Sequence, residues 1–131
     1  MAGEILYLDA SALVKLVRAE PESIAMMNET VRWDHLVTSV VAAIELRRVA
    51  LRDRGDPRRV TDVLARVNGF ELDEGVRETA ATLEPRTLRT LDAIHLATAI
   101  ALEEDLGAIA CYDERLARAA KSEGLRVVSP R

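Results

Sequence analysis

Short apolar runs alternate with longer segments of helical periodicity along the whole chain. The run Ile5–Leu8 ends at Asp9, which is typical of a buried strand that leads directly into a helix. Further strands are predicted at 36–39, 70–72, 108–112 and 125–128, with helices over 12–17, 22–31, 40–54, 58–67, 74–83, 90–106 and 114–122. Mostly apolar strands separated by helices indicate a parallel sheet covered on both faces. The predicted fold class is therefore α/β, a three-layer α/β/α sandwich around a mostly parallel five-stranded sheet.

Local signals also predict where these helices begin, end and face the core. Ser11 is expected to cap the first helix, because its hydroxyl can accept a hydrogen bond from a backbone N–H of the first turn. Gly107 is expected to end the longest helix in a left-handed conformation. On the second helix, Ile24, Met27 and Val31 recur at helical spacing, which predicts that they share one apolar face.

Composition narrows the class of protein further. The chain has 131 residues, 49% of them hydrophobic, which predicts one folded domain over residues 1–131. The single cysteine, Cys111, excludes an intramolecular disulfide and a multi-cysteine zinc site, as expected in a reducing compartment. The sequence has neither an apolar run near the ~20 residues that span a bilayer nor a recognisable signal peptide. We expect a soluble cytoplasmic protein with no membrane partner.

The charge balance is mildly acidic, with 22 acidic and 18 basic side chains and a formal net charge of -4. A strongly basic nucleic-acid binder is thereby excluded, so any phosphate contacts must come from a local basic patch. Such a patch exists over residues 47–59, where the sequence has six arginines and only two aspartates. Arg47, Arg48 and Arg52 are its candidate nucleic-acid contacts. The alternative is an ordinary solvated helix face.

Two predicted strands end in an aspartate, Asp9 and Asp113. In an open parallel sheet the functional crevice lies beyond the carboxyl ends of the strands. If these two strands are neighbours, their carboxylates converge at one edge of the sheet. Each aspartate also has a simpler explanation as the cap of the following helix.

Two further carboxylates lie in apolar helical segments. Glu45 follows four apolar residues in the middle of its predicted helix, where an ionised carboxylate is costly unless a cation compensates it. A pair with Arg48, three residues further on, is the structural alternative. Asp92 shares a helix face with His95, although its place in a first turn also suits the helix dipole. His95 is more typical of a packed, hydrogen-bonded residue than of a general base.

Carboxylates that are forced together repel one another, so they must bind protons or recruit a cation. Oxygen ligands without a cysteine or histidine cluster select a hard ion, Mg2+ or Mn2+, over zinc. Such an ion polarises a phosphodiester and lowers the pKa of a bound water. The residues therefore indicate metal-assisted phosphodiester hydrolysis.

The four acidic segments resemble the motifs of PIN-domain ribonucleases, and most closely those of the VapC toxins of bacterial toxin-antitoxin pairs. They are LDASAL around Asp9, AIEL around Glu45, LDAIHLATA around Asp92 and YDERL around Asp113. Their order, their spacing and the total length agree with the family over essentially the whole chain. The segment around Asp92 is the most specific of the four.

This resemblance implies a Mg2+- or Mn2+-dependent endoribonuclease that cuts RNA, such as RNA used in translation, and is held inactive by a cognate antitoxin. By the motif match, Asp9, Glu45, Asp92 and Asp113 would form the catalytic, metal-binding site. The same resemblance suggests a homodimer. It also makes the antitoxin an alternative partner for the arginine-rich segment.

Two residues near the motifs would support the acids indirectly. Ser11 is expected to donate a hydrogen bond to Asp9. The family commonly carries Thr or Ser two residues before the last aspartate, where this chain has Cys111. A thiol is a weaker hydrogen-bond donor than a hydroxyl, so any support of Asp113 from this position is weaker than is usual in the family.

Other functions are compatible with parts of this pattern. A non-catalytic PIN-like module that binds RNA or protein is the main alternative, and the presence of all four acids argues against it. A phosphoacceptor receiver domain needs a lysine at a late strand end, whereas Lys15 and Lys121 are both predicted on helices. A phosphatase of the Asp-x-Asp type would need a second aspartate where Ser11 stands.

The early helices also carry more apolar residues than one inward face requires. We therefore expect a groove for an antitoxin helix at one group of positions, namely Leu13, Leu16, Val17, Val41 and Ala42.

Overall fold

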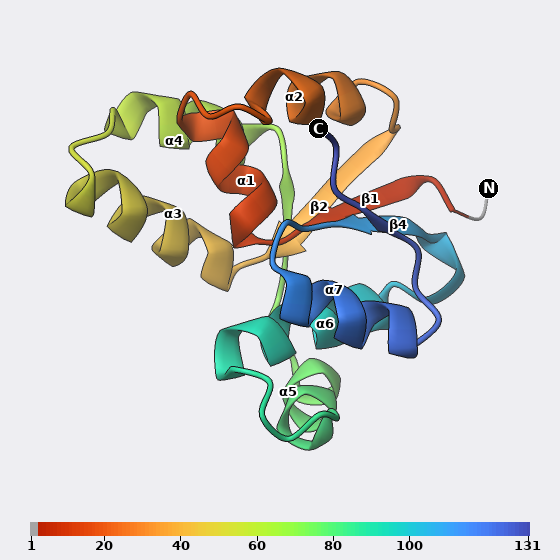
Figure 1. Ribbon diagram of the computed structural model, residues 1–131. Helices are drawn as coiled ribbons and strands as arrows, with labels where there is room; N and C mark the ends of the chain where they lie inside the picture. The colour runs from red at the N-terminus through yellow and green to blue at the C-terminus, as the bar shows by residue number, and fades with distance from the viewer. Residues whose placement is uncertain (1–2) are drawn as a thin grey trace.

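The computed structural model describes residues 3–131 and has a five-stranded sheet between layers of helices (Figure 1). The strands are β1 (Ile5–Leu8), β2 (His35–Ser39), β3 (Asn68–Phe70), β4 (Leu106–Ala110) and β5 (Val127–Val128). The helices are α1 (Ala10–Val17), α2 (Ser23–Thr30), α3 (Val41–Arg52), α4 (Pro57–Ala65), α5 (Glu74–Thr82), α6 (Thr90–Ala101) and α7 (Glu114–Ser122), with a 3-10 turn at Glu103–Asp105. The strand order is β3-β2-β1-β4-β5 and every pair is parallel. The predicted α/β/α sandwich is confirmed.

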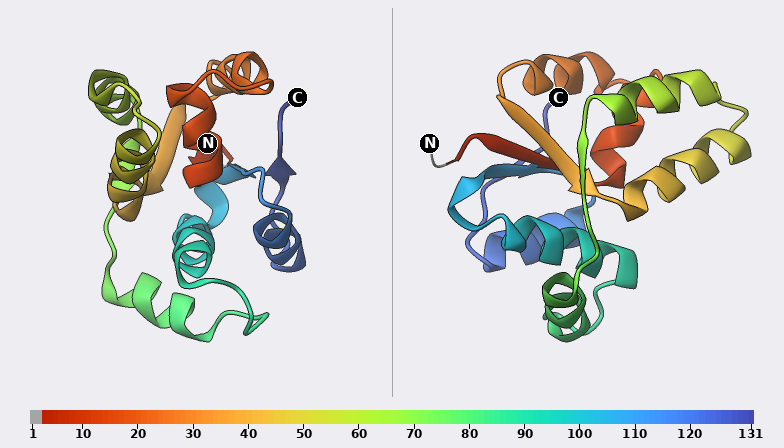
Figure 2. Two further views of the ribbon diagram at one scale, coloured as in Figure 1. Left: turned by 60° about the vertical axis from the view of Figure 1, so that its left-hand side comes forward. Right: turned by 180° about the vertical axis from the view of Figure 1, so that it is seen from behind.

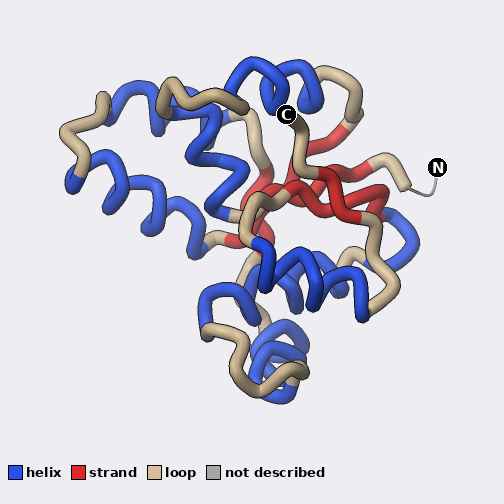
Figure 3. The backbone as a smooth tube through the Cα atoms, viewed as in Figure 1, coloured by secondary structure: helices blue, strands red, loops and turns tan. Residues whose placement is uncertain are grey.

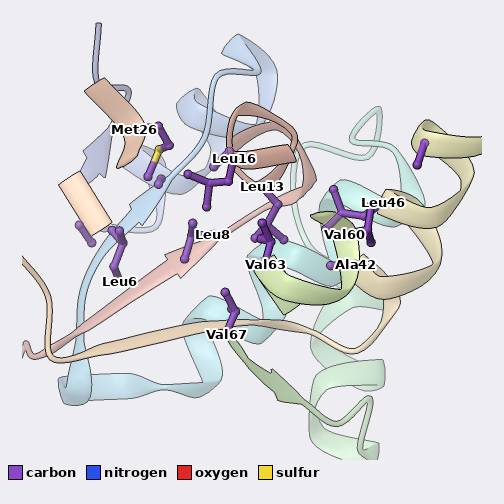
Figure 4. Packing of buried hydrophobic residues seen from close by; sticks show 14 residues of the cluster. Leu6, Leu8, Leu13, Leu16, Met26, Ala42, Leu46, Val60, Val63 and Val67 are labelled. Atoms are coloured by element: carbon purple, nitrogen blue, oxygen red, sulfur yellow. The ribbon is translucent and has the colours of Figure 1, made fainter. Parts of the chain in front are cut away.

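Alternate side chains of the central strand β1 enter two separate hydrophobic clusters. Leu6 and Leu8 pack against α1, α2, α3 and α4 on one face of the sheet (Figure 4). Tyr7 points to the other face, where α6 and α7 pack. Because successive strand residues point to opposite faces, three consecutive residues of β1 anchor both layers. Figures 2 and 3 show the helices on the two sides of the strands.

Helix α5 lies outside these two clusters and packs mainly against α6. No helix within residues 3–131 is both long enough and apolar enough to cross a membrane.

Two predicted helix ends are wrong. The first helix is capped by Asp9 rather than by Ser11, so it begins at Ala10. The helix predicted to reach residue 106 ends at Ala101, and Gly107 lies inside β4. The ring of Trp33 lies so close to Gly107 that any side chain there would collide with it. This glycine is required by a close tertiary contact, not by a helix end.

Helix α2 turns only one edge to the core. The side chain of Met26 is buried, whereas Ile24 on the helix and Val31 directly after it are 74% and 84% exposed. The antitoxin groove expected at α1 and α3 is not found. In the expected antitoxin groove, Leu13 and Ala42 are fully buried. These residues fill the core between α1 and α3, so the groove is not open to a partner.

Candidate functional site

Asp9 and Asp113 follow neighbouring strands at the carboxyl edge of the sheet. The register pairs Leu8 of β1 with Ala110 of β4, and α1 and α7 begin directly after the two aspartates (Figure 1). Both are helix caps: Asp9 Oδ1 accepts a hydrogen bond of 2.9 Å from the Ala12 N–H, and Asp113 Oδ1 accepts one of 2.9 Å from Leu116. All the hydrogen bonds to these carboxylates within residues 3–131 go to Oδ1. Capping therefore orients each group and leaves Oδ2 for other chemistry.

Ser11 links the two strand ends. Its hydroxyl donates a hydrogen bond of 2.7 Å to Asp9 Oδ1 and accepts one of 2.9 Å from the backbone N–H of Tyr112. Tyr112 immediately precedes Asp113. One side chain thus sets the distance between the loops that carry both aspartates.

Asp92 approaches the same edge from the first turn of α6. Burial raises its pKa, and the charges of Asp113 and Glu45 raise it further, while the Arg89 charge opposes the shift. These causes show that carboxylates from α3, α6 and the β4–α7 loop lie within electrostatic reach of one another.

Asp9 is the most buried of the four acids, with 3% of its surface exposed. Burial raises its pKa from 3.8 to about 6, and the Asp92 charge adds to this effect. The hydrogen bonds from Ser11 and Ala12 work in the opposite direction. An ionised carboxylate in this position is destabilised by desolvation and would gain from a nearby cation.

Glu45 is held by His95, which lies 50 residues away in sequence. Its Oε1 lies 2.7 Å from His95 Nε2, and the other ring nitrogen, Nδ1, lies 2.6 Å from the hydroxyl of Tyr7. Glu45 is partly exposed, while His95 and Tyr7 are buried. The expected packed role for His95 is confirmed, and the pairing of Glu45 with Arg48 is wrong.

Cys111 lies in the core below the site and not among the carboxylates. Its thiol makes only a weak 3.9 Å contact with the backbone carbonyl of Asp113. Burial raises the pKa of the thiol to about 12, and the charges of Asp9, Asp113 and Asp92 contribute to the shift. Cys111 therefore remains a protonated thiol at neutral pH and supports the loop rather than the Asp113 carboxylate.

The arginine candidates lie on α3, and all three are exposed. Arg52 also contacts Asp53 at 3.3 Å. Asp53 forms an ion pair with Arg18. The acidic Asp53 thus links the end of α3 to the end of α1, while the arginines remain at the surface.

The site contains two residues that the sequence analysis did not select. Tyr7 holds His95, and its place two residues before Asp9 on a strand puts both side chains on one face, which is a usable sequence signal. Arg89 directly precedes α6 and its charge opposes the rise in the pKa of Asp92, but an arginine in a loop carries no comparable signal.

The donor chemistry fits a hard divalent cation. The available atoms are carboxylate oxygens, which Mg2+ and Mn2+ prefer, and the buried Asp9 would be stabilised by positive charge. Within residues 3–131, no group of three or more His, Cys, Asp or Glu side chains is arranged so that it could already hold an ion. Mutual repulsion keeps uncompensated carboxylates apart. We therefore expect small rotations of the carboxylate side chains when a cation binds.

Comparisons with known proteins identify the family of this chain. The family model described as "PIN domain" matches residues 6–122. The protein called Ribonuclease VapC46 from Mycobacterium tuberculosis is 43% identical over 127 residues, which span 95% of this chain and 97% of that protein.

Solved structures share the fold at lower identity. A chain in a toxin-antitoxin complex from Klebsiella pneumoniae has a TM-score of 0.75 and 20% identity, covering 96% of this chain and 98% of its own. VapC20 from Mycobacterium tuberculosis, described as a sarcin-ricin loop cleaving toxin, has a TM-score of 0.71 and 15% identity, covering 95% and 99%. The chain therefore belongs to the PIN-domain family and is similar in sequence to its VapC ribonucleases.

Proposed function

We propose that this chain is an endoribonuclease toxin that hydrolyses RNA phosphodiester bonds with Mg2+ or Mn2+ and is neutralised by a cognate antitoxin. The observation that carries the proposal is the convergence of four acids from separate segments on one sheet edge, where the pKa of the buried Asp9 is raised to about 6. A structural role does not require this concentration of negative charge. The names of the VapC relatives support RNA as the substrate.

In this proposal Asp9, Asp92 and Asp113 contact the metal directly, with Glu45 as a further ligand or the group that orients the attacking water. Oδ2 of Asp9 and of Asp113 is available because Oδ1 serves the helix cap. The bound ion supplies a water of lowered pKa and polarises the scissile phosphate. Ser11 keeps the two capping loops together, so the carboxylates stay in register while RNA binds.

RNA would approach along arginines that flank the acids. Arg48 lies one turn beyond Glu45 on α3, and Arg89 precedes Asp92, so both sit next to a proposed ligand. Arg47 and Arg52 would extend the contact along α3. Phosphate contacts of this kind position the RNA, while few aromatic residues are available for base stacking.

The antitoxin would bind the hairpin formed by α3 and α4, which projects from the body of the molecule (Figure 1). A groove between these helices is lined by residues with apolar side chains and by arginines, namely Arg47, Ala50, Leu51, Arg54, Gly55, Pro57, Val60 and Thr61. Leu51 is 77% exposed. Apolar contacts edged by positive charge suit an amphipathic segment with acidic residues. We also expect a homodimer and a cytoplasmic site of action.

Cleavage of RNA by the purified, antitoxin-free chain tests this function. We expect discrete cuts with Mn2+ or Mg2+ and none after chelation, with the cut ends mapped by sequencing. A non-catalytic PIN-like module would leave RNA intact and would gain no thermal stability from Mn2+. That pair of results would contradict the proposal.

A further inference from the structure

A buried hydrogen-bonded chain connects the two helical layers at the edge of the candidate site. It runs from Tyr7 on β1 through His95 on α6 to Glu45 on α3. Tyr7 and His95 belong to the layer packed by α6 and α7, whereas α3 covers the opposite face of the sheet. This chain is therefore the link between Glu45 and the side of the site that carries Asp92.

We propose that Tyr7 and His95 are positioning residues, which hold the Glu45 carboxylate in the orientation required at the metal site. This inference rests on the proposed function, because it assigns Glu45 to that site. It adds a role for two residues other than the four acids, and it makes His95 a hydrogen-bond donor rather than a general base.

The distances define which atoms form the hydrogen bonds of this chain. Tyr7 is fully buried, and its phenol hydroxyl carries a hydrogen that it can donate. Its oxygen lies 2.6 Å from His95 Nδ1. When one imidazole nitrogen accepts such a bond, the hydrogen resides on the other. Nε2–H then faces Glu45 Oε1 at 2.7 Å.

The ring has little freedom to turn away from this arrangement. His95 is 1% exposed and meets Tyr7 edge to face, with ring centroids 5.8 Å apart. The described residues give the Glu45 carboxylate one hydrogen bond, and it goes to Oε1. Oε2 is therefore the atom presented to the site. Fixing one carboxylate oxygen is how groups behind a metal ligand commonly tune its orientation.

Without the Tyr7 hydroxyl, His95 Nδ1 loses the hydrogen bond that anchors the ring. Nε2–H is then held less firmly toward Glu45 Oε1. Glu45 would leave its position although the fold is intact. The consequence for metal binding is a loss of about 10-fold to 100-fold in affinity, the range found when such supporting groups are removed.

Two measurements on the full chain test the proposal without relying on RNA cleavage. The first is the nitrogen NMR spectrum of the imidazole in His35→Gln, a surface change that leaves His95 as the only histidine. We expect a hydrogen on Nε2, and a change in the Nδ1 chemical shift that reports the loss of an accepted hydrogen bond when Tyr7→Phe is added. A neutral ring with its single hydrogen on Nδ1 in the presence of Tyr7 would mean that Nε2 accepts from Glu45, and it would overturn the proposal.

The second measurement is Mn2+ affinity by calorimetry. We expect about a 10-fold loss for Tyr7→Phe and a larger loss for His95→Leu, whereas His95→Gln recovers most of the affinity because its amide offers an N–H toward Glu45. Val63→Ala, a buried change in α4, controls for destabilisation alone. Equal Mn2+ affinity in wild type, Tyr7→Phe and His95→Leu would also overturn the proposal.

Asp9→Asn separates this failure from failure of the proposed function. If Asp9→Asn abolishes cleavage while the Tyr7 and His95 variants bind Mn2+ normally, only the positioning role is wrong. If Asp9→Asn cleaves RNA as fast as wild type, the proposed function itself is wrong, and with it the role of Glu45 on which the positioning depends.

Discussion

The carboxylates at the sheet edge and the arginines of the α3–α4 hairpin are both charged regions, but they differ in how firmly their side chains are held. Asp9 and Asp113 are fixed as helix caps and Glu45 is tied to His95. Arg47 and Arg48 are exposed. The first region is held by directional contacts and the second is accessible to large partners.

This difference assigns different kinds of function to the two regions. Chemistry needs groups that are anchored close to their working positions, and hydrogen bonds anchor Asp9, Asp113 and Glu45 in this way. Recognition of a phosphate backbone or of a helix tolerates mobile side chains, and the arginines supply these. Changes among the acids should therefore alter the rate of cleavage and the stability, while changes on the hairpin should alter binding.

The largest expected effect comes from removing one charge among the acids. Asp92→Asn should lower the rate of RNA cleavage roughly 1,000-fold, because metal-assisted catalysis depends on several kcal/mol of charge stabilisation. Single-turnover cleavage at saturating RNA measures this loss. The matched control is Asp105→Asn, which should cleave normally. Asp105 is exposed and lies just before β4, at the end of the strand opposite to Asp113. Equal rates in wild type and Asp92→Asn would refute the catalytic assignment.

The second effect is a gain and not a loss: removing the Asp9 charge should raise the free energy of unfolding. The pKa of Asp9 rises from 3.8 to about 6 on folding, so its protonation favours the folded state below about pH 4 and this contribution is lost as the pH rises through 6. Without divalent ions, Asp9→Asn should then be more stable than wild type by up to about 3 kcal/mol at pH 7. Asparagine also caps helices well, so α1 is retained.

Urea denaturation at several pH values checks this prediction. The advantage of Asp9→Asn should be absent near pH 4 and constant above about pH 7. Addition of Mn2+ should stabilise wild type more than the variant. A variant that is less stable than wild type at pH 7 without metal would mean that the Asp9 carboxylate is not strained.

The hairpin should respond in binding and not in catalysis. Leu51→Ala should weaken antitoxin affinity about 30-fold, the effect of losing a contact worth about 2 kcal/mol at the centre of an interface. RNA cleavage by the free toxin should be unchanged. Val31→Ala on α2 removes an equally exposed apolar residue outside the groove and should retain affinity. Loss of affinity in both variants to the same degree would argue against the α3–α4 groove.

A smaller effect is expected from Arg48→Ala, which should raise KM for RNA several-fold and leave kcat nearly unchanged. Each lost phosphate contact reduces the slope of log affinity against log salt by about 0.7 for single strands. Salt titrations of RNA binding to wild type and Arg48→Ala therefore report whether this arginine touches the backbone. Arg66→Ala, on the surface after α4, is the control. A salt slope identical in wild type and Arg48→Ala would assign Arg48 to another role.

Elements whose signals are local were predictable from the sequence. Helix α7 has the bounds that its capping aspartate and apolar spacing predict, and β1 has those of its apolar run. The role of Gly107 could not be predicted, because the ring of Trp33, far away in sequence, is what leaves no room for a side chain there. Long-range contacts of this kind leave no periodic trace.

The same distinction applies to the site. Glu45 was recognisable as a carboxylate in apolar surroundings, but its partner could not be chosen between the nearby Arg48 and the distant His95. Only the packing of α3 against the sheet edge decides this, and it favours His95. The sequence therefore predicts which acids belong to the candidate site, while the fold determines how their side chains are oriented.

Anomalous diffraction from crystals of the wild-type protein grown with Mn2+ tests the central claim most directly. We predict one or more Mn2+ peaks at the carboxyl edge of the sheet, about 2.1 Å from carboxylate oxygens of at least two of Asp9, Asp92 and Asp113, the distance usual for a small octahedral divalent ion. Mn2+ bound elsewhere on the surface, with these three carboxylates free of metal at saturating concentration, would contradict the account.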